Sequence, residues 1–131
     1  MLGKFIFARN LSKAYTLASQ NEIVGAIFHL NKCVNDIEKY KHKFPDFYIL
    51  YGDLNYLNNN LSIAKKYLHQ ATELLKENTI YSLDEKKYLY AYIYNILANI
   101  AYKENDSFCE EYDSLSQRKN FEIENVRKTL Q

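Results

Sequence analysis

Few residues of the chain have the types and spacing that metal binding or catalysis requires. His29 and Cys33 lie one helical turn apart, so an imidazole and a thiolate would reach the same metal ion. A closed site needs more ligands, and no CxxC, HExxH or second Cys/His pair completes this one. We therefore expect Cys33 to fill a small packing position, and we expect neither a metal site nor a cofactor.

Carboxylates and hydroxyls offer no better catalytic arrangement. Glu110 and Glu111 are adjacent in a helical segment and point about 100° apart, so they cannot work as a carboxylate pair. No serine stands in a nucleophile-elbow sequence, and three glycines are too few for a phosphate-binding loop. We expect no enzymatic activity; an enzyme is the contrasting alternative, which tight metal binding at His29 and Cys33 would favour.

Length and composition set the class of protein. The 131 residues are 47% hydrophobic and 25% charged, which predicts a single domain with a substantial core. The net charge of +1 argues against nucleic acid, whose recognition usually needs a strongly basic face. Three Gly and one Pro argue against an all-β fold with many tight turns.

The cellular compartment follows from the cysteines and from hydropathy. Cys33 and Cys109 lie too far apart to suggest a disulfide framework, which favours a reducing compartment. Residues 1–10 contain no long apolar stretch, so we expect no signal peptide. No run of about 18 apolar residues predicts a membrane span. We expect a cytoplasmic protein that does not bind membranes.

Apolar residues recur at intervals of three and four, which predicts an all-α fold. Breaks rich in Asn and Ser separate six expected helices, at about 3–18, 21–42, 45–58, 61–77, 83–103 and 107–128. Two capping boxes, Ser19-x-x-Glu22 and Ser82-x-x-Glu85, are predicted to open the second and fifth helices.

The segment 88–94 is ambiguous because its apolar residues alternate as in a strand. It follows a capping box and lies in a long stretch without Gly or Pro, so we predict a helix. Tyr88 and Tyr92 would share one face of this helix, and Tyr90 and Tyr94 nearly the opposite one. A helix that is apolar all round is normally central to the packing; an exposed tyrosine face that meets a partner is the alternative.

The third and fourth expected helices carry a recognisable pattern, Tyr48-x-x-Tyr51-Gly52-x-x-x-Tyr56 followed by Ala64-x-x-x-Leu68-x-x-Ala71. This pattern resembles a tetratricopeptide repeat, in which small side chains let the two helices of a hairpin approach and large ones fill the remaining space. Only residues 45–78 carry the resemblance specifically.

Weaker copies of the pattern flank this hairpin. Its positions are occupied by Ala14, Ala26, Leu30 and Cys33 in the first copy, and by Tyr94, Leu97, Ala98, Tyr102, Cys109 and Ser116 in the third. The resemblance implies one domain, 1–131, in which hairpins at about 3–42, 45–78 and 83–128 stack as a short right-handed superhelix. The polar last helix would serve as its cap.

The resemblance also implies a concave surface, lined by the first helix of each hairpin, that binds another protein or a peptide. Tyr offers a large contact area at low entropy cost, and Asn hydrogen-bonds a peptide backbone. The expected binding residues are Tyr15, Asp53, Tyr56, Tyr92, Asn95, Asn99, Tyr102 and Lys103. Leu11 and Ile49 face the same way but are expected to pack between hairpins.

Several roles fit a small binding protein of this kind. It would be an immunity or antitoxin protein that neutralises a toxin domain, a bacterial secretion chaperone, or a fragment of a peptide-responsive regulator. The carboxylate clamp of one repeat subclass is absent, since its positions hold Leu11, Tyr15, Leu57 and Asn58. The acidic last helix, with Glu110, Glu111 and Asp113, is the alternative binding face, and the oligomeric state stays open.

Overall fold

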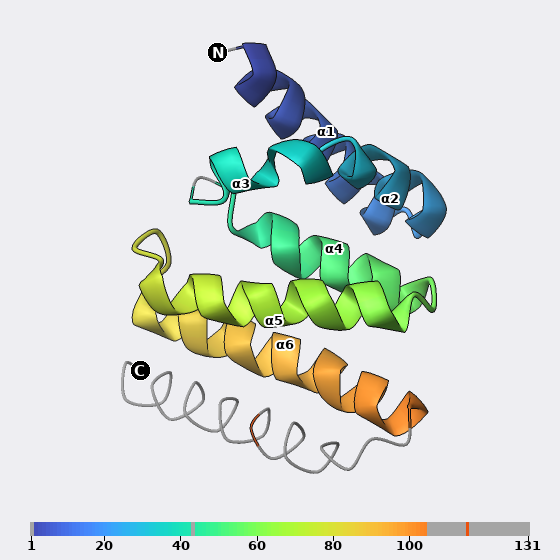
Figure 1. The fold of residues 1–131 in the computed structure, drawn as a ribbon, viewed down its shortest axis with the longest axis vertical. Coiled ribbons are helices and arrows are strands. Elements are labelled where there is room, and N and C mark those ends of the chain that lie inside the picture. The colour runs from blue at the N-terminus through green and yellow to red at the C-terminus, as the bar shows by residue number, and fades with distance from the viewer. Residues whose placement is uncertain (1, 43, 105–114, 116–131) are drawn as a thin grey trace. The chain divides into compact units, whose positions relative to one another are not determined.

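The computed structural model describes residues 2–42, 44–104 and 115, and this part of the chain contains helices and no strand. The helices are α1 (Leu2–Ser19), α2 (Ile23–Asn31), a 3₁₀ turn η1 (Val34–Asp36), α3 (Ile37–Tyr40), α4 (Asp46–Leu57), α5 (Leu61–Glu77) and α6 (Leu83–Lys103). Figure 1 shows their order along the chain. The predicted all-α class is confirmed.

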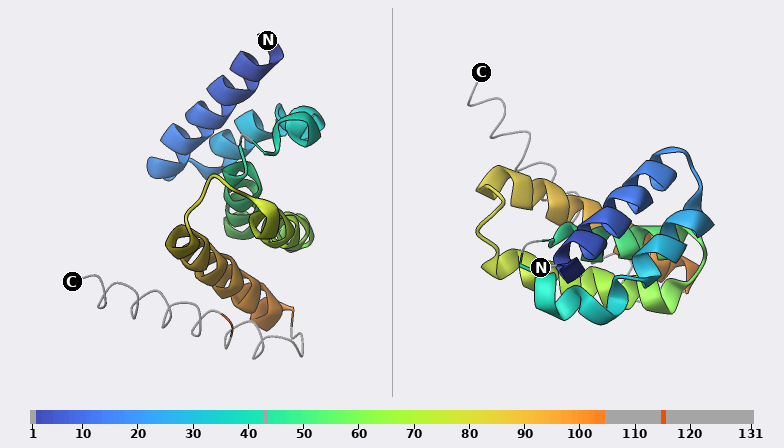
Figure 2. Two further views of the ribbon diagram at one scale, coloured as in Figure 1. Left: turned by 90° about the vertical axis from the view of Figure 1, so that its left-hand side faces the viewer. Right: turned by 90° about the horizontal axis from the view of Figure 1, so that it is seen from above.

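The chain divides into two compact units, Met1–Ala71 and Thr72–Gln131. The N-terminal unit contains α1 to α4 and the first part of α5, and the C-terminal unit contains the end of α5 and α6. Within the N-terminal unit, α1 packs on α2 and α2 packs on α4, as Figures 1 and 2 show from different sides.

The predicted ends of two helices are reproduced without change. The segments 61–77 and 83–103 are α5 and α6, and residues 88–94 are helical. A capping box opens α6: Ser82 Oγ accepts from the Glu85 backbone N–H at 3.1 Å, and Glu85 Oε1 accepts from the Ser82 backbone N–H at 2.9 Å. These two reciprocal bonds satisfy two backbone N–H groups that would otherwise lack a partner at the start of α6. The start of this helix could therefore be predicted from the four residues of the capping box.

The expected continuous helix 21–42 is wrong, because the structure divides it into α2, η1 and α3. The backbone N–H of Cys33 donates to Leu30 O at 2.8 Å, and that of Asp36 donates to Cys33 O at 3.0 Å. Bonds that span three residues tighten the backbone into a 3₁₀ turn. Asn, Val and Asp in this stretch are weak helix formers, so local propensity does not oppose the break.

The capping box predicted at Ser19 and Glu22 is also wrong. Ser19 Oγ instead donates to Thr16 O at 2.6 Å, and Glu22 has no side-chain capping bond. Asn21 adopts a left-handed conformation with φ 61°, and the Glu22 backbone N–H donates to Leu17 O at 2.8 Å. This is a Schellman-type ending of α1, in which Asn takes the position that usually holds Gly.

The hairpin of α4 and α5 packs through the small residues that the sequence pattern singled out. A Cβ atom on Gly52 would lie 2.6 Å from Leu68 Cγ and 3.4 Å from the Ala64 carbonyl oxygen. Ala64, Leu68 and Ala71 are buried, and so are the matching residues of the first hairpin, Ala14, Ala26, Leu30 and Cys33. These positions of the sequence pattern are therefore buried, whereas the repeat identity stays a prediction.

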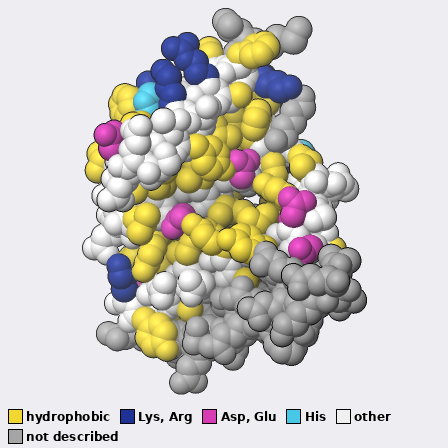
Figure 3. Space-filling view, turned by 180° about the vertical axis from the view of Figure 1, so that it is seen from behind, with side chains coloured by type: hydrophobic (Ala, Val, Ile, Leu, Met, Phe, Trp, Pro, Cys, Tyr) yellow, Lys and Arg dark blue, Asp and Glu magenta, His cyan; other side chains and the backbone are white. Residues whose placement is uncertain are grey.

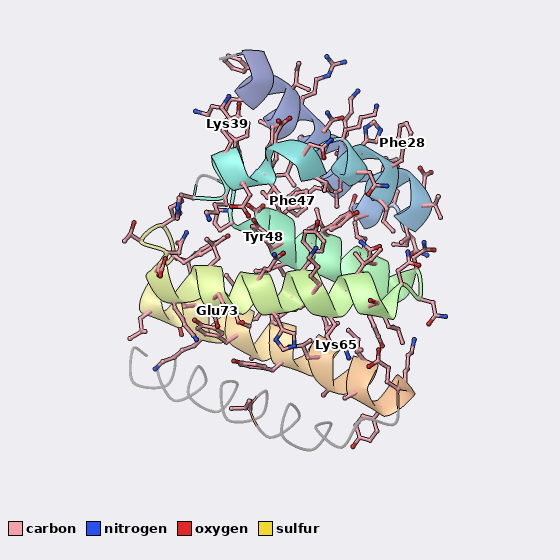
Figure 4. All side chains as sticks on the ribbon, in the orientation of Figure 1. Phe28, Lys39, Phe47, Tyr48, Lys65 and Glu73 are labelled. Carbon is pink, nitrogen blue, oxygen red and sulfur yellow. The ribbon has the colours of Figure 1, made fainter. Side chains whose placement is uncertain are left out.

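Aromatic rings fill the space around α4 in the N-terminal unit. Phe47 is fully buried, with ring centroids 5.4 Å from Tyr51 in a stacked arrangement and 5.8 Å from Phe7 of α1. Figure 4 shows Phe47 and Tyr48 projecting from α4. The predicted last helix, 107–128, lies outside the described residues apart from Leu115, and with it lie Cys109, Ser116 and the acidic face of Glu110, Glu111 and Asp113. The stacking of three hairpins thus stays a prediction.

Candidate functional site

The eight residues predicted to bind a partner fall into two groups in the structure. Tyr15, Asp53 and Tyr56 belong to the N-terminal unit, and Tyr92, Asn95, Asn99, Tyr102 and Lys103 all belong to α6 of the C-terminal unit. The structure brings the second group together on one helix. The first group is distributed over α1 and α4.

The residues of the N-terminal unit are engaged with their own chain. The Tyr15 hydroxyl donates a hydrogen bond to Asp46 Oδ2 and so ties α1 to the start of α4. Asp53 and Tyr56 are half-buried on α4, and each has further interactions within the protein. Leu11 and Ile49 are buried, as expected for packing residues. These tyrosine and aspartate side chains serve the fold as well as the surface.

One side of α6 presents tyrosine and asparagine side chains to solvent, and we name it the α6 face. Its members are Tyr88, Tyr92, Asn95, Asn99 and Tyr102, all exposed and spaced by four, three, four and three residues. The exposed fractions of the three tyrosines are 51%, 39% and 58% in chain order. Residues at this spacing share one side of a helix. This helix, expected to be central to the packing, therefore leaves one side exposed, and the alternative of an exposed tyrosine face describes that side.

The opposite side of α6 explains this orientation. Tyr90 and Tyr94 are half-buried and stacked, with centroids 6.1 Å apart, and the Tyr90 hydroxyl donates to Thr72 O of α5 at 3.4 Å. Ile93, Leu97 and Ile100 are almost fully buried. Burial of these three aliphatic side chains fixes the rotation of α6, which leaves the α6 face exposed.

Two amides in the middle of the α6 face are free to bind. Within the described residues, neither the Asn95 nor the Asn99 side chain forms a hydrogen bond. Four residues of helix separate them by about 6 Å along the axis. Each amide offers an acceptor oxygen and two donor hydrogens. This part of the face can therefore pair with polar groups of a bound molecule.

Two shallow hollows lie beside Tyr88. The described residues that line the first, of about 260 Å³, are Tyr81, Asp84, Glu85, Tyr88 and Leu89. Those that line the second, of about 240 Å³, are Tyr88, Ala91, Tyr92 and Asn95. Tyr88 borders both hollows. Tyr88, Tyr81 and Asp84 were not among the expected binding residues, although the four-residue spacing of Tyr88 and Tyr92 was a usable signal.

Hydrophobic side chains reach the surface elsewhere as well. Figure 3 shows one face of the molecule on which hydrophobic side chains are widespread, with Asp and Glu side chains scattered among them. The exposed large apolar residues outside the α6 face include Phe5, Val24, Phe28, Ile80 and Leu83. No helix in the described part of the chain is long and apolar enough to cross a membrane.

His29 and Cys33 contact neighbouring groups of the fold. Cys33 is buried, and its Sγ lies 3.7 Å from Phe7 O and 3.8 Å from His29 O. Burial, with a smaller effect of Asp36, raises the pKa of the thiol to about 11, so it is protonated at neutral pH. His29 Nδ1 is 3.1 Å from Asn10 Oδ1; partial burial and then Lys32 and Lys13 lower the pKa of this imidazole. Within residues 2–42, 44–104 and 115, no three His, Cys, Asp or Glu side chains are placed to share a metal ion.

No family model, curated protein or solved structure matches the chain.

Proposed function

We propose that this chain is a non-enzymatic protein that binds a segment of another protein on the α6 face. The observation that carries the proposal is the row of exposed Tyr and Asn side chains on α6, next to two hollows and with two unpaired amides. The solvent-facing side of a helix ordinarily carries charged residues such as Lys and Glu. The five positions of the α6 face hold tyrosine and asparagine instead, which favours a surface that contacts another molecule.

Tyrosine supplies the binding energy in this proposal. Tyr88, Tyr92 and Tyr102 combine a large apolar ring with a hydroxyl, and such side chains are enriched among the residues that dominate binding energy at interfaces. They lose little rotamer freedom on binding because only two χ angles are fixed. The three rings therefore form the anchoring part of the surface.

The asparagines favour an extended segment as the occupant. The roughly 6 Å between Asn95 and Asn99 along α6 is close to the about 6.6–6.8 Å that separates alternate residues of an extended chain. An extended segment has free backbone N–H and C=O groups to pair with both amides. A partner helix satisfies its own backbone, so the amides would depend on polar side chains of that helix to avoid costly burial without hydrogen bonds.

The tetratricopeptide-like architecture is part of the same proposal. Close contact at Gly52 and burial of the small residues in the first two hairpins support it. Neutralising a toxin domain, guarding a secreted substrate and sensing a peptide are three roles that use such binding.

The test compares the partners captured by the protein and by matched variants. The variant Tyr92→Ala with Asn99→Ala removes a ring and an amide from the α6 face. A control, Ile63→Ala with Gln70→Ala, removes an exposed apolar side chain and an exposed amide from α5. We expect the original protein and the control to capture the same partner, and the α6 variant to lose it.

Calorimetry with the purified partner then gives the magnitude. Truncation of a central tyrosine typically costs about 2 kcal/mol or more, which weakens binding about thirtyfold. Equal affinity of the α6 variant and the original protein, with unchanged helical circular dichroism, would show that another surface binds the partner.

A further inference from the structure

We infer that the hollow between Tyr81 and Tyr88 is a subsite for a Lys or Arg side chain of the bound segment. The inference rests on the proposed function and adds the chemistry of one residue of the partner. Its basis is the set of side chains that line the hollow, together with a carboxylate oxygen of Asp84 that has no hydrogen-bond partner among the described residues.

The lining suits each part of a long basic side chain. Two tyrosine rings can hold a cation over their faces, and the carboxylates of Asp84 and Glu85 supply opposite charge. Leu89 gives the aliphatic stem an apolar wall, and Lys and Arg commonly bury this stem while the charged head stays polar. No Lys or Arg is among the described residues that line the hollow.

The capping of α6 accounts for Glu85 but not for Asp84. Glu85 Oε1 accepts the Ser82 backbone N–H, whereas Asp84 Oδ1 is buried and has no hydrogen-bond partner in the described part of the chain. A carboxylate oxygen shielded from water without a partner is costly. A cation in the adjoining hollow offsets part of this cost through its charge, without having to reach Oδ1 itself.

The distance between the two hollows matches the spacing of alternate side chains in an extended segment. The α6 residues that line the two hollows are centred about five positions apart, which is about 7.5 Å along the helix axis. Alternate side chains of an extended chain are separated by about 6.6–6.8 Å and point the same way. The basic residue and the residue two places along the segment therefore fit the two hollows together.

The first experiment uses small probes on the full chain and does not depend on the partner. Amide NMR spectra are recorded during titration with butylammonium, which models a lysine side chain, and with n-butanol, its neutral counterpart. We expect saturable shifts at Tyr81, Asp84 and Tyr88 with butylammonium, and about tenfold weaker binding of n-butanol. The isosteric variant Asp84→Asn should remove the difference, whereas Glu77→Gln, on the exposed end of α5, should keep it. Equal binding of both probes, or no effect of Asp84→Asn, would overturn the subsite.

The second experiment separates the subsite from the proposed function. Peptides are selected from a display library on the full chain, and the basic residue of each is replaced by norleucine. The original protein should prefer the basic peptide about tenfold. Asp84→Asn should lose this preference but still bind the norleucine peptide, and Tyr92→Ala with Asn99→Ala should weaken both peptides.

A preference that survives Asp84→Asn would overturn the subsite and leave the proposed function standing. Binding that survives the Tyr92 and Asn99 truncations would overturn the proposed function, whatever happens at Asp84.

Discussion

Gly52 of α4 lies so close to Leu68 of α5 that a Cβ atom at position 52 would be 2.6 Å from Leu68 Cγ and 2.7 Å from Leu68 Cδ2. Leu68 is fully buried, so it has little space into which to withdraw. Because protein interiors are close-packed, an added Cβ atom at position 52 would push neighbouring atoms aside instead of filling empty space. The identity of one glycine therefore fixes how closely the two helices of this hairpin approach.

Gly52→Ala should destabilise the protein by about 1–3 kcal/mol, because the added methyl group overpacks the contact with Leu68. Urea unfolding followed by circular dichroism measures the change. Gly25→Ala is the matched control: its Cβ would lie 3.4 Å from Leu17 Cδ1, an ordinary contact, and Ala favours the helix over Gly. The control should keep or raise the stability, and a Gly52→Ala variant as stable as the control would contradict the packing described for this hairpin.

Ala71→Leu should also cost about 1–3 kcal/mol, since Ala71 is buried on the packed side of α5. The neighbouring change Gln70→Leu places the same side chain at an exposed position and should have little effect. Thermal unfolding of the two variants side by side measures the difference. An unchanged melting temperature for Ala71→Leu would mean that the repeat register is wrong.

The capping box of α6 should make stability depend on pH. Hydrogen bonds from the Ser82 backbone N–H and, secondarily, its side chain lower the pKa of Glu85 below the ordinary value of a glutamate. A carboxyl whose pKa is lower in the folded chain contributes stability above its unfolded pKa, and this contribution is lost as the pH falls through the folded pKa. The stability advantage of the original protein over Glu85→Gln should thus be greatest at neutral pH and shrink in acid.

Urea unfolding at several pH values between 3 and 7 measures that advantage, with Glu77→Gln as an exposed control on α5. A constant difference between the original protein and Glu85→Gln over this range would contradict the linkage.

Cys33 should resist thiol reagents while the protein is folded. Burial raises the pKa of this thiol to about 11, so almost none of it is thiolate at pH 8. In a Cys109→Ser background, labelling by a disulfide reagent should become rapid only when urea unfolds the chain. Labelling of the native protein at the rate of a free cysteine would place Cys33 outside the core.

Local chemistry determined much of this protein from sequence alone. The ends of α5 and α6 and the capping box of Ser82 and Glu85 were predictable because each depends on residues within one or two turns. The packing role of Gly52 and Ala64 was predictable because only small side chains fit where two helices approach closely. The same local reasoning failed at Glu22, where a left-handed Asn21 and a capping box compete for the same short sequence and only one conformation forms.

Tertiary structure decided which side of α6 is available for binding. Tyr88 and Tyr92 on one side, and Tyr90 and Tyr94 on the other, have the same side chain and equivalent spacing, so periodicity cannot distinguish them. Burial of Ile93, Leu97 and Ile100 sets the rotation of the helix, and the Tyr90 hydroxyl bonds to Thr72 of α5. Exposure of the α6 face is thus a property of packing between segments distant in sequence, which no local pattern encodes.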